Sequence, residues 1–263
     1  MSNEDRVVIE LDGVVGVSDI GPRPKDEDFI IAQKIITETG HHLEIAVLLD
    51  GMGGGVAGEM ASESAGSAFI EACTIIAGDM EPSTSAEERD ASWEMCIIAA
   101  NRAVEQVANK EGGRSGTTLT GIILMRDEEG RIAWSDLVHI GDTRAYVNSG
   151  GQVTLLSEDH SMTGEMMRAG YIEIHEIEKT HGHNVLTMSL GGPDELEPMI
   201  KEVNLANGDM IILCCDGVWG PLHTETGLWL SEDSDVEEMS KAMVAEALNR
   251  GSKDNCSILI WSI

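Results

Sequence analysis

Residues 45–55 read Ile-Ala-Val-Leu-Leu-Asp-Gly-Met-Gly-Gly-Gly. The apolar run that ends at Leu49 predicts a buried strand, and Asp50-Gly51 follows it directly. An Asp-Gly pair after a strand is most often a simple turn. The same pair also places a carboxylate next to a glycine. Because glycine has no side chain, its backbone carbonyl is accessible, and a metal ion can bind there. Taken alone, the stretch leaves both interpretations open.

Other acidic residues occupy the same kind of position. Asp216 follows one apolar run, Asp254 precedes another, and Asp26-Glu27-Asp28 leads into a third. Mg²⁺ and Mn²⁺ prefer carboxylate and carbonyl oxygens as ligands. Each aspartate alone is better explained by a turn or a helix cap. The set predicts a metal cluster built from Asp50, Asp216, Asp254 and the Gly51 carbonyl.

Two other features bear on that cluster. The histidines at 41, 42, 181 and 183 lie in turns and polar loops, which makes zinc the poorer choice of metal. Arg23 stands between Pro22 and Pro24, so its backbone is stiff and holds it near the acidic group. An arginine fork beside a metal pair suits a phosphate oxyanion, whereas an exposed arginine that pairs with nearby acids is the simpler alternative.

Composition bounds the class of protein. The chain has 263 residues, 42% of them hydrophobic, and no linker-like segment, which favours one domain over 1–263 with a short tail at 1–6. No apolar run is long enough to span a bilayer and the N-terminus lacks signal-peptide features, so we expect a cytoplasmic protein. The five cysteines lack C-x-x-C spacing and are expected to be reduced.

The formal net charge is −30, from 47 acidic and 17 basic residues. Nucleic acid and anionic membranes would be repelled over the whole surface, so neither is expected as a partner. Most of the carboxylates are interpreted as a solvated acidic surface.

The apolar pattern predicts an α+β fold with antiparallel sheets covered by long helices. The turns at 128–130 and 148–151 join neighbouring strands as hairpins, unlike the alternation of a doubly wound fold. Strands are predicted at 14–19, 28–33, 43–50, 117–125, 131–140, 143–148, 152–156, 199–205, 209–215 and 255–262. Helices are predicted at 56–77, 87–110, 161–169 and 235–249, with a loop at 79–90.

Eight segments stand in the order and spacing of a known family. They are G-V-S-D-I-G-x-R-x-x-D-E-D at 16–28, V-L-L-D-G-M-G-G-G-V-A-G-E-M-A-S at 47–62, S-G-T-T at 115–118, H-I-G-D-T-R-A-Y at 139–146, L-S-E-D-H-S at 156–161, N-V-L-T-M-S-L-G at 184–191, C-C-D-G-V-W at 214–219 and G-S-K-D-N-C-S at 251–257. With them the chain resembles the metal-dependent type 2C (PPM) serine/threonine protein phosphatases in their compact bacterial form.

The resemblance implies a four-layer α-β-β-α sandwich with a metal site at one end. It implies that Asp50 bridges two Mn²⁺ or Mg²⁺ ions, with the Gly51 carbonyl, Asp216 and Asp254 as further ligands. Glu27 and Asp28 would hold metal-bound waters or ligate directly, and Asp142 with Asp216 would hold a third, weaker ion. Arg23 would bind the phosphoryl group, and the segment 160–195 would form a flap, with His181 assigned to substrate contact. An exposed loop histidine is the alternative for His181.

The resemblance also implies the reaction: a metal-activated water hydrolyses phosphoserine and phosphothreonine in proteins, with no phosphoenzyme. Met52 stands where eukaryotic relatives carry a histidine, which favours water as the acid for the leaving group. Cys215 replaces a serine, and Asp26 an asparagine, of the family pattern. None of the departures removes a metal ligand.

The expected partners are phosphoproteins modified by a serine/threonine kinase acting in trans, and the expected state is a monomer. Two alternatives remain open at this point. One is a sporulation-regulator type of phosphatase with one dedicated phosphoprotein partner. The other is a pseudophosphatase that binds phosphoproteins without hydrolysing them.

Overall fold

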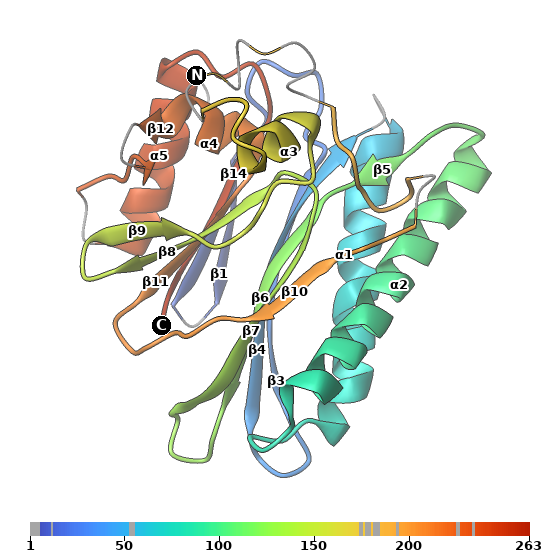
Figure 1. Cartoon of the computed structure of the whole chain (residues 1–263), viewed down its shortest axis with the longest axis vertical. Coiled ribbons are helices and arrows are strands. Elements are labelled where there is room, and N and C mark those ends of the chain that lie inside the picture. Colours follow the sequence, from blue (N-terminus) through green and yellow to red (C-terminus); the bar gives the residue numbers. More distant parts are fainter. Residues whose placement is uncertain are drawn as a thin grey trace.

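The structure, a computed structural model, describes residues 6–11, 13–52, 56–173, 176, 180, 185–192, 195–224, 227–232 and 235–263. Two antiparallel sheets stack face to face, with helices on both outer sides (Figure 1). The first sheet has the order β1 (Arg6–Leu11), β2 (Val14–Asp19), β14 (Cys256–Ser262), β11 (Met210–Cys214), β8 (Arg144–Ser149), β9 (Gln152–Leu155). The second has the order β10 (Met199–Glu202), β7 (Ile132–Ile140), β6 (Leu119–Arg126), β4 (His42–Met52), β3 (Asp28–Ile36), with β5 (Gly116–Thr117) paired to β4.

Helices α1 (Val56–Ile76) and α2 (Ala86–Glu111) cover the second sheet, with a short 3₁₀ turn, η2 (Ala77–Asp79), after α1. Helices α4 (Asp216–Leu222) and α5 (Val236–Asn249) pack against the first sheet. Helix α3 (Met162–Arg168) and the β12 (His223–Thr224) and β13 (Gly227–Leu228) hairpin complete the described elements. The predicted α+β class and four-layer arrangement are confirmed.

The position of strand β4 between two hydrophobic cores explains why the apolar run 45–49 has no polar residue. Ile45, Val47 and Leu49 pack in the core between the second sheet and helices α1 and α2. Ala46 and Leu48 point the other way, into the core shared with the first sheet. Because successive side chains of a strand face opposite sides, a strand between two apolar layers has no polar face.

Three details differ from the predicted elements. Helix α2 begins at Ala86, one residue before the predicted helix 87–110, and so overlaps the predicted loop 79–90, because Ser85 and Glu88 form a capping box at its start. Strand β1 begins at Arg6, the last residue of the predicted tail, while residues 1–5 lie outside the described part. Helix α4 was not predicted at all, since its opening residues Asp216-Gly217 read as a turn.

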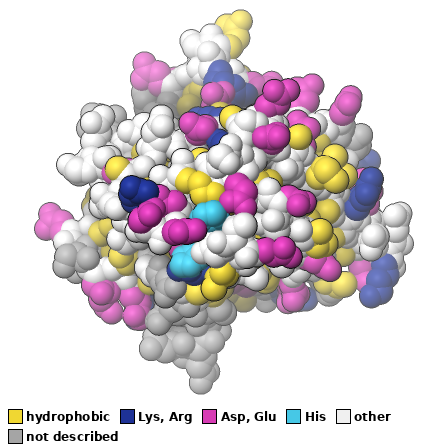
Figure 2. All heavy atoms as spheres, turned by 90° about the horizontal axis from the view of Figure 1, so that it is seen from below, with side chains coloured by type: hydrophobic (Ala, Val, Ile, Leu, Met, Phe, Trp, Pro, Cys, Tyr) yellow, Lys and Arg dark blue, Asp and Glu magenta, His cyan; other side chains and the backbone are white. Residues whose placement is uncertain are grey.

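Acidic side chains outnumber basic ones on the surface (Figure 2), in line with the 47 acidic and 17 basic residues of the sequence. Figure 2 shows the face seen from below, where acidic side chains are spread among few basic ones. No helix among the described residues is both long enough and apolar enough to cross a membrane. The predicted location in the cytoplasm stays a prediction.

A buried polar contact fixes α2 to the second sheet. Arg89 of α2 donates to both carboxylate oxygens of Asp136 in β7, at 2.7 and 3.1 Å, and also to Glu202 of β10 at 2.6 Å. The Trp93 indole Nε1 donates to Asp136 as well, at 2.8 Å. The Arg89 and Asp136 side chains are only 4% and 1% exposed, so the Asp136 carboxylate depends on Arg89 for charge compensation.

We predict that Arg89→Ala lowers the free energy of unfolding by about 3–5 kcal/mol, because it leaves the Asp136 carboxylate buried without its cation. Urea denaturation followed by circular dichroism measures the loss. Arg131→Ala is the matched control, since Arg131 is 71% exposed and its ion pairs lie on the surface, where the change should stay within about 0.5 kcal/mol. Equal losses in the two variants would contradict this account.

Candidate metal centre

The sheet topology brings the strand-end acids to one end of the sandwich. Antiparallel register sets Asp28, the first residue of β3, opposite Asp50 near the end of β4. In the first sheet, Asp216 follows the end of β11 and Asp254 precedes the start of β14, which pairs antiparallel with β11. Asp142 lies in the turn between β7 and β8, next to the same end of β11. Five aspartates from both sheets therefore converge.

The most compact group of donors joins Asp28, Asp50 and Cys215. One ligand atom from each lies within 4.8 Å of the other two. Asp28 Oδ2 and Asp216 Oδ1 are buried and have no hydrogen-bond partner. Buried carboxylate oxygens are normally paired or bound to a metal. Buried carboxylate oxygens without a hydrogen-bond partner are suitable ligands for divalent cations such as Mn²⁺ and Mg²⁺.

The carboxylates act on one another electrostatically. Burial, and then the charges of Asp28, Asp216, Asp142 and Asp254, raise the pKa of Asp50 well above its ordinary value. Burial and the charge of Asp254 raise the pKa of Asp216 to about 6. Burial is also the largest cause of the raised pKa of Asp28 and of Asp142. The mutual repulsion of these carboxylates exceeds the compensation from nearby arginines, and a divalent ion supplies the positive charge that would offset it.

The Asp50-Gly51 segment is held from two sides. Thr118 donates its backbone N–H to the Asp50 carbonyl at 2.9 Å and accepts the Asp50 N–H on Oγ1 at 2.8 Å. Thr117 Oγ1 donates to the same carbonyl at 2.9 Å. On the other side, Gly51 donates to the Glu27 carbonyl at 3.1 Å. A Cβ at position 51 would lie 2.4 Å from that carbonyl oxygen, so only glycine fits there.

Asn255 ties the acidic loop to Asp254. Its Nδ2 donates to the carbonyls of Ile20 at 2.9 Å and Lys25 at 2.8 Å, and its Oδ1 accepts from Glu27 N at 3.0 Å. Its own N–H donates to Asp254 Oδ1 at 2.9 Å. One buried amide side chain thus fixes the backbone before Asp28 relative to the strand that starts after Asp254.

Asp216 and Asp142 are positioned by packing around α4. A Cβ at Gly217 would lie 2.0 Å from the Asn255 carbonyl oxygen, so glycine lets the start of α4 approach the start of β14. Trp219 Nε1, in the same helix, donates to the Asp142 carbonyl at 3.0 Å. The guanidinium of Arg144 stacks on the Trp219 ring at 3.6 Å from its centroid. These contacts link the third-ion candidate Asp142 to the helix that begins with Asp216.

Arg23 lies at the edge of this cluster. Its Nη2 pairs with Asp254 Oδ2 at 2.5 Å and its Nε donates to the Lys253 carbonyl at 3.0 Å. The side chain is 48% exposed, so it stands where solvent meets the carboxylates. Its predicted role as a phosphate ligand is not tested by this contact.

Two other predicted residues need separate mention. The Glu27 carboxylate lies against the first turn of α1, because a Cβ at Gly58 would be 2.5 Å from Glu27 Oε1. Among the described residues, Glu27 is outside the group of three possible ligands formed by Asp28, Asp50 and Cys215, and so are Asp142, Asp216 and Asp254. His181 falls outside the described residues, so its predicted substrate contact stays a prediction.

Several positioning residues had no role in the sequence interpretation. Thr117 and Thr118 belong to the S-G-T-T segment, and Asn255 belongs to the segment at 251–257, so the motifs contained them without saying what they do. Their roles become visible only in the folded structure. Thr118 is 68 positions from Asp50 in the sequence, and Asn255 is 235 positions from Ile20.

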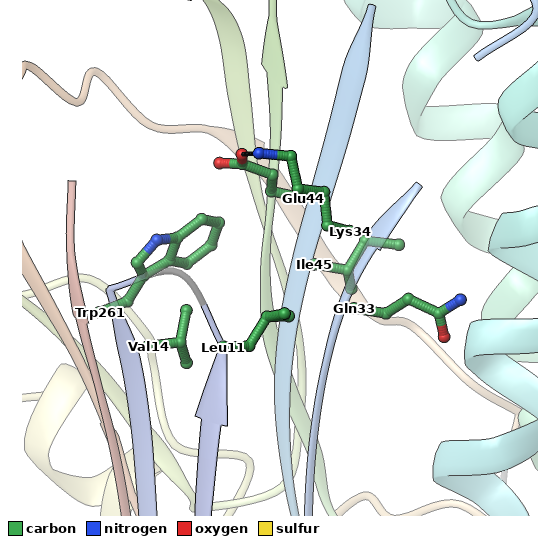
Figure 3. Close-up of a pocket in the computed structure, with 7 residues that line it drawn as sticks. All are labelled: Leu11, Val14, Gln33, Lys34, Glu44, Ile45 and Trp261. Atoms are coloured by element: carbon green, nitrogen blue, oxygen red, sulfur yellow. Dashed lines mark ion pairs between the residues drawn. The ribbon is translucent and has the colours of Figure 1, made fainter. Parts of the chain in front are cut away.

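A small pocket elsewhere contains none of the site residues. It opens between the two sheets towards the far end of β2 and β14 (Figure 3). An ion pair of 3.1 Å between Lys34 and Glu44 lies in it. The lining residues are Leu11, Val14, Gln33, Lys34, Glu44, Ile45 and Trp261.

Comparisons with known proteins give the family of the chain. The family model described as protein phosphatase 2C matches residues 31–253. Protein phosphatase PhpP of Streptococcus pneumoniae is 27% identical over 250 residues, which cover 94% of this chain and 96% of that protein.

Solved structures extend the comparison to the fold. The serine/threonine phosphatase PstP/Ppp of Mycobacterium tuberculosis has a TM-score of 0.76 at 26% identity, covering 98% of this chain and 99% of that one. The catalytic domain of PstP in complex with two manganese ions has a TM-score of 0.71 at 28% identity, covering 94% and 96%.

A metal-dependent phosphatase is the class that the fold and the cluster define. The chain belongs to the protein phosphatase 2C (PPM) family, as a compact catalytic domain of the bacterial type. It is a protein serine/threonine phosphatase, and its chemistry is the metal-dependent dephosphorylation of serine and threonine in proteins.

We predict that the metal-free protein loses stability as the pH rises from about 4 to about 6.5. An unfolded aspartate titrates near pH 3.9, whereas burial and Asp254 hold the pKa of Asp216 at about 6 in the folded state. The folded state therefore keeps protons that the unfolded state has released, and the free energy of unfolding falls with pH.

Urea denaturation in EDTA across this pH range measures the slope. Asp216→Asn should give a shallower fall than wild type, because it removes one of the carboxyls that titrate late. A wild-type stability that rises through the same range, with no difference from Asp216→Asn, would contradict the mutual repulsion.

We also predict that Asn255→Ala lowers the free energy of unfolding by about 2–4 kcal/mol, because several buried backbone groups lose their partner at once. Asn148→Ala is the control, since Asn148 Oδ1 accepts from Gly151 N in an exposed turn, and it should cost less than about 1 kcal/mol. Urea denaturation of both variants, without metal, makes the comparison. A loss for Asn255→Ala no larger than for the control would refute the positioning role.

Proposed function

We propose that Asp50, the Gly51 carbonyl, Asp216 and Asp254 hold two Mn²⁺ or Mg²⁺ ions. Glu27 and Asp28 act as ligands or hold metal-bound water, and Asp142 with Asp216 takes a third, weaker ion. The observation that carries the proposal is the pair of buried oxygens, Asp28 Oδ2 and Asp216 Oδ1, that have no hydrogen-bond partner in a cluster of like charges.

When bound, divalent ions at such a site lower the pKa of water and stabilise charge on a phosphoryl group. The protein's own contribution is to hold the carboxylates at fixed strand ends with their backbone tied by Thr118 and Asn255. Arg23, anchored on the Lys253 carbonyl at the edge of the cluster, binds phosphate oxygens with its guanidinium.

The cysteines next to Asp216 do not act as nucleophiles in this proposal. Cys214 and Cys215 are fully buried. Burial raises the pKa of both thiols, so neither is a thiolate near neutral pH. The proposed reaction therefore has no phosphocysteine, and a metal-activated water attacks the phosphoryl group directly.

The substrates are phosphoproteins, as the family implies. We propose that a serine/threonine kinase acting in trans phosphorylates them and that the phosphatase works as a monomer. The predicted flap, 160–195, contributes Met162 and Val185 beside each other, joined by a hydrogen bond from Met162 N to the Val185 carbonyl at 2.9 Å. Both side chains are exposed and apolar, a surface suited to contacting a polypeptide next to the phosphorylated residue.

The ligand assignment predicts that Mn²⁺ raises the melting temperature of the wild-type protein and that Asp50→Asn abolishes this shift together with phosphatase activity. A stabilisation of about 2.7 kcal/mol is expected at a metal concentration 100 times the dissociation constant. Thermal denaturation with and without Mn²⁺, and hydrolysis of a phosphothreonine peptide, are the two measurements.

Asp209→Asn is the matched control. Asp209 precedes β11 at the end opposite to Asp216, and its Oδ2 accepts a hydrogen bond from Ala206 N at 2.8 Å. It should keep both the Mn²⁺ shift and the activity. An Asp50→Asn variant that folds and is stabilised by Mn²⁺ as strongly as wild type would overturn the ligand assignment.

A further inference from the structure

Cys215 is the one cysteine among the described residues that belongs to the metal cluster. Its Sγ lies within 4.8 Å of ligand oxygens of both Asp28 and Asp50. In a tetrahedral zinc site a sulfur ligand and an oxygen ligand lie about 3.6 Å apart. The thiol and the carboxylates must therefore move closer together when they share a cation.

The neighbouring cysteines do not have this placement. Cys214 is the last residue of β11 and is buried in the core of the first sheet. Cys256 starts β14, where its Sγ contacts Ser252 Oγ at 3.3 Å and the Gly217 carbonyl at 3.4 Å. Neither belongs to a group of three possible ligands in the described part of the chain.

Two backbone groups hold the Cys215 sulfur beside Asp28 and Asp50. Ser257 N donates to Sγ at 3.1 Å, and Sγ lies 3.4 Å from the Asn255 carbonyl. With its proton present, the thiol donates to the Asn255 carbonyl. The backbone N–H of Ser257 would continue to support a sulfur that carries negative charge.

A second observation points independently to a cation at this place. Asp28 Oδ2 is buried without a hydrogen-bond partner although the thiol is beside it. A structure of a relative, the PstP catalytic domain, holds two manganese ions. The position of Cys215 corresponds to a serine in the family pattern that the sequence resembles.

We propose that Cys215 makes the metal centre thiophilic: its Sγ joins Asp28 and Asp50 in binding Zn²⁺ or Cd²⁺, which compete with Mn²⁺ for the site. The thiol proton passes to solvent as the sulfur–metal bond forms. Thiolate ligands favour zinc and other soft cations, whereas carboxylate, carbonyl and water suit manganese and magnesium. The inference rests on the proposed Asp28 and Asp50 ligands and adds a selectivity that a carboxylate site lacks.

The test is a Cd²⁺ titration of the metal-free full chain, followed by ultraviolet absorption and by calorimetry. A sulfur-to-cadmium charge-transfer band should grow in the wild-type protein and be absent from Cys215→Ser. Loss of the sulfur should weaken Cd²⁺ binding about tenfold or more. The dissociation constant for Mn²⁺ should change much less, so the Cd²⁺-over-Mn²⁺ preference falls.

Cys214→Ala and Cys256→Ser are the controls, and both should keep the band. A band that persists in Cys215→Ser, or disappears in Cys256→Ser, would overturn the assignment to Cys215. Wild type that binds Mn²⁺ by calorimetry but shows no sulfur band would overturn this inference and leave the proposed function standing. Failure to bind either cation would overturn both. Circular dichroism and the melting temperature of each variant establish that it is folded.

Discussion

Repulsion among buried carboxylates is the interaction on which the active centre depends. Asp28, Asp142, Asp216 and Asp254 all raise the cost of charge on Asp50, and burial raises it further. A folded chain tolerates such a group only if a cation neutralises it or if protons stay bound. A divalent ion that binds there would relieve the repulsion among the carboxylates. Without an ion, the rest of the fold has to hold the carboxylates close together.

The sheets supply that restraint through register. Because β3 pairs with β4, and β11 with β14, in antiparallel fashion, the ends that carry the aspartates meet at the same end of the sandwich. Thr118 fixes the backbone of Asp50, and Asn255 connects the acidic loop to the strand after Asp254. Helices α1 and α2 on one side and α5 on the other bury the outer faces, so the strand ends are held on rigid elements.

Much of this arrangement can be predicted from the chain, for identifiable reasons. Strand β4 is evident because it is buried on both faces and reads as an unbroken apolar run. The aspartates are evident because each stands directly at the end of such a run. Helix α4 is harder to predict, since Asp216-Gly217 resembles a turn and Pro221 disfavours a helix interior. The roles of Thr118 and Asn255 depend on partners 68 and up to 235 positions away, which no local pattern contains.

The metal ligands themselves are the central claim. A crystal structure of the protein grown with Mn²⁺, with data collected at the manganese absorption edge, tests it most directly. The account predicts two anomalous peaks within bonding distance of the Asp50 carboxylate, one of them also bound by Asp216 and Asp254. Peaks confined to surface carboxylates, with Asp50 bound to no metal, would contradict it.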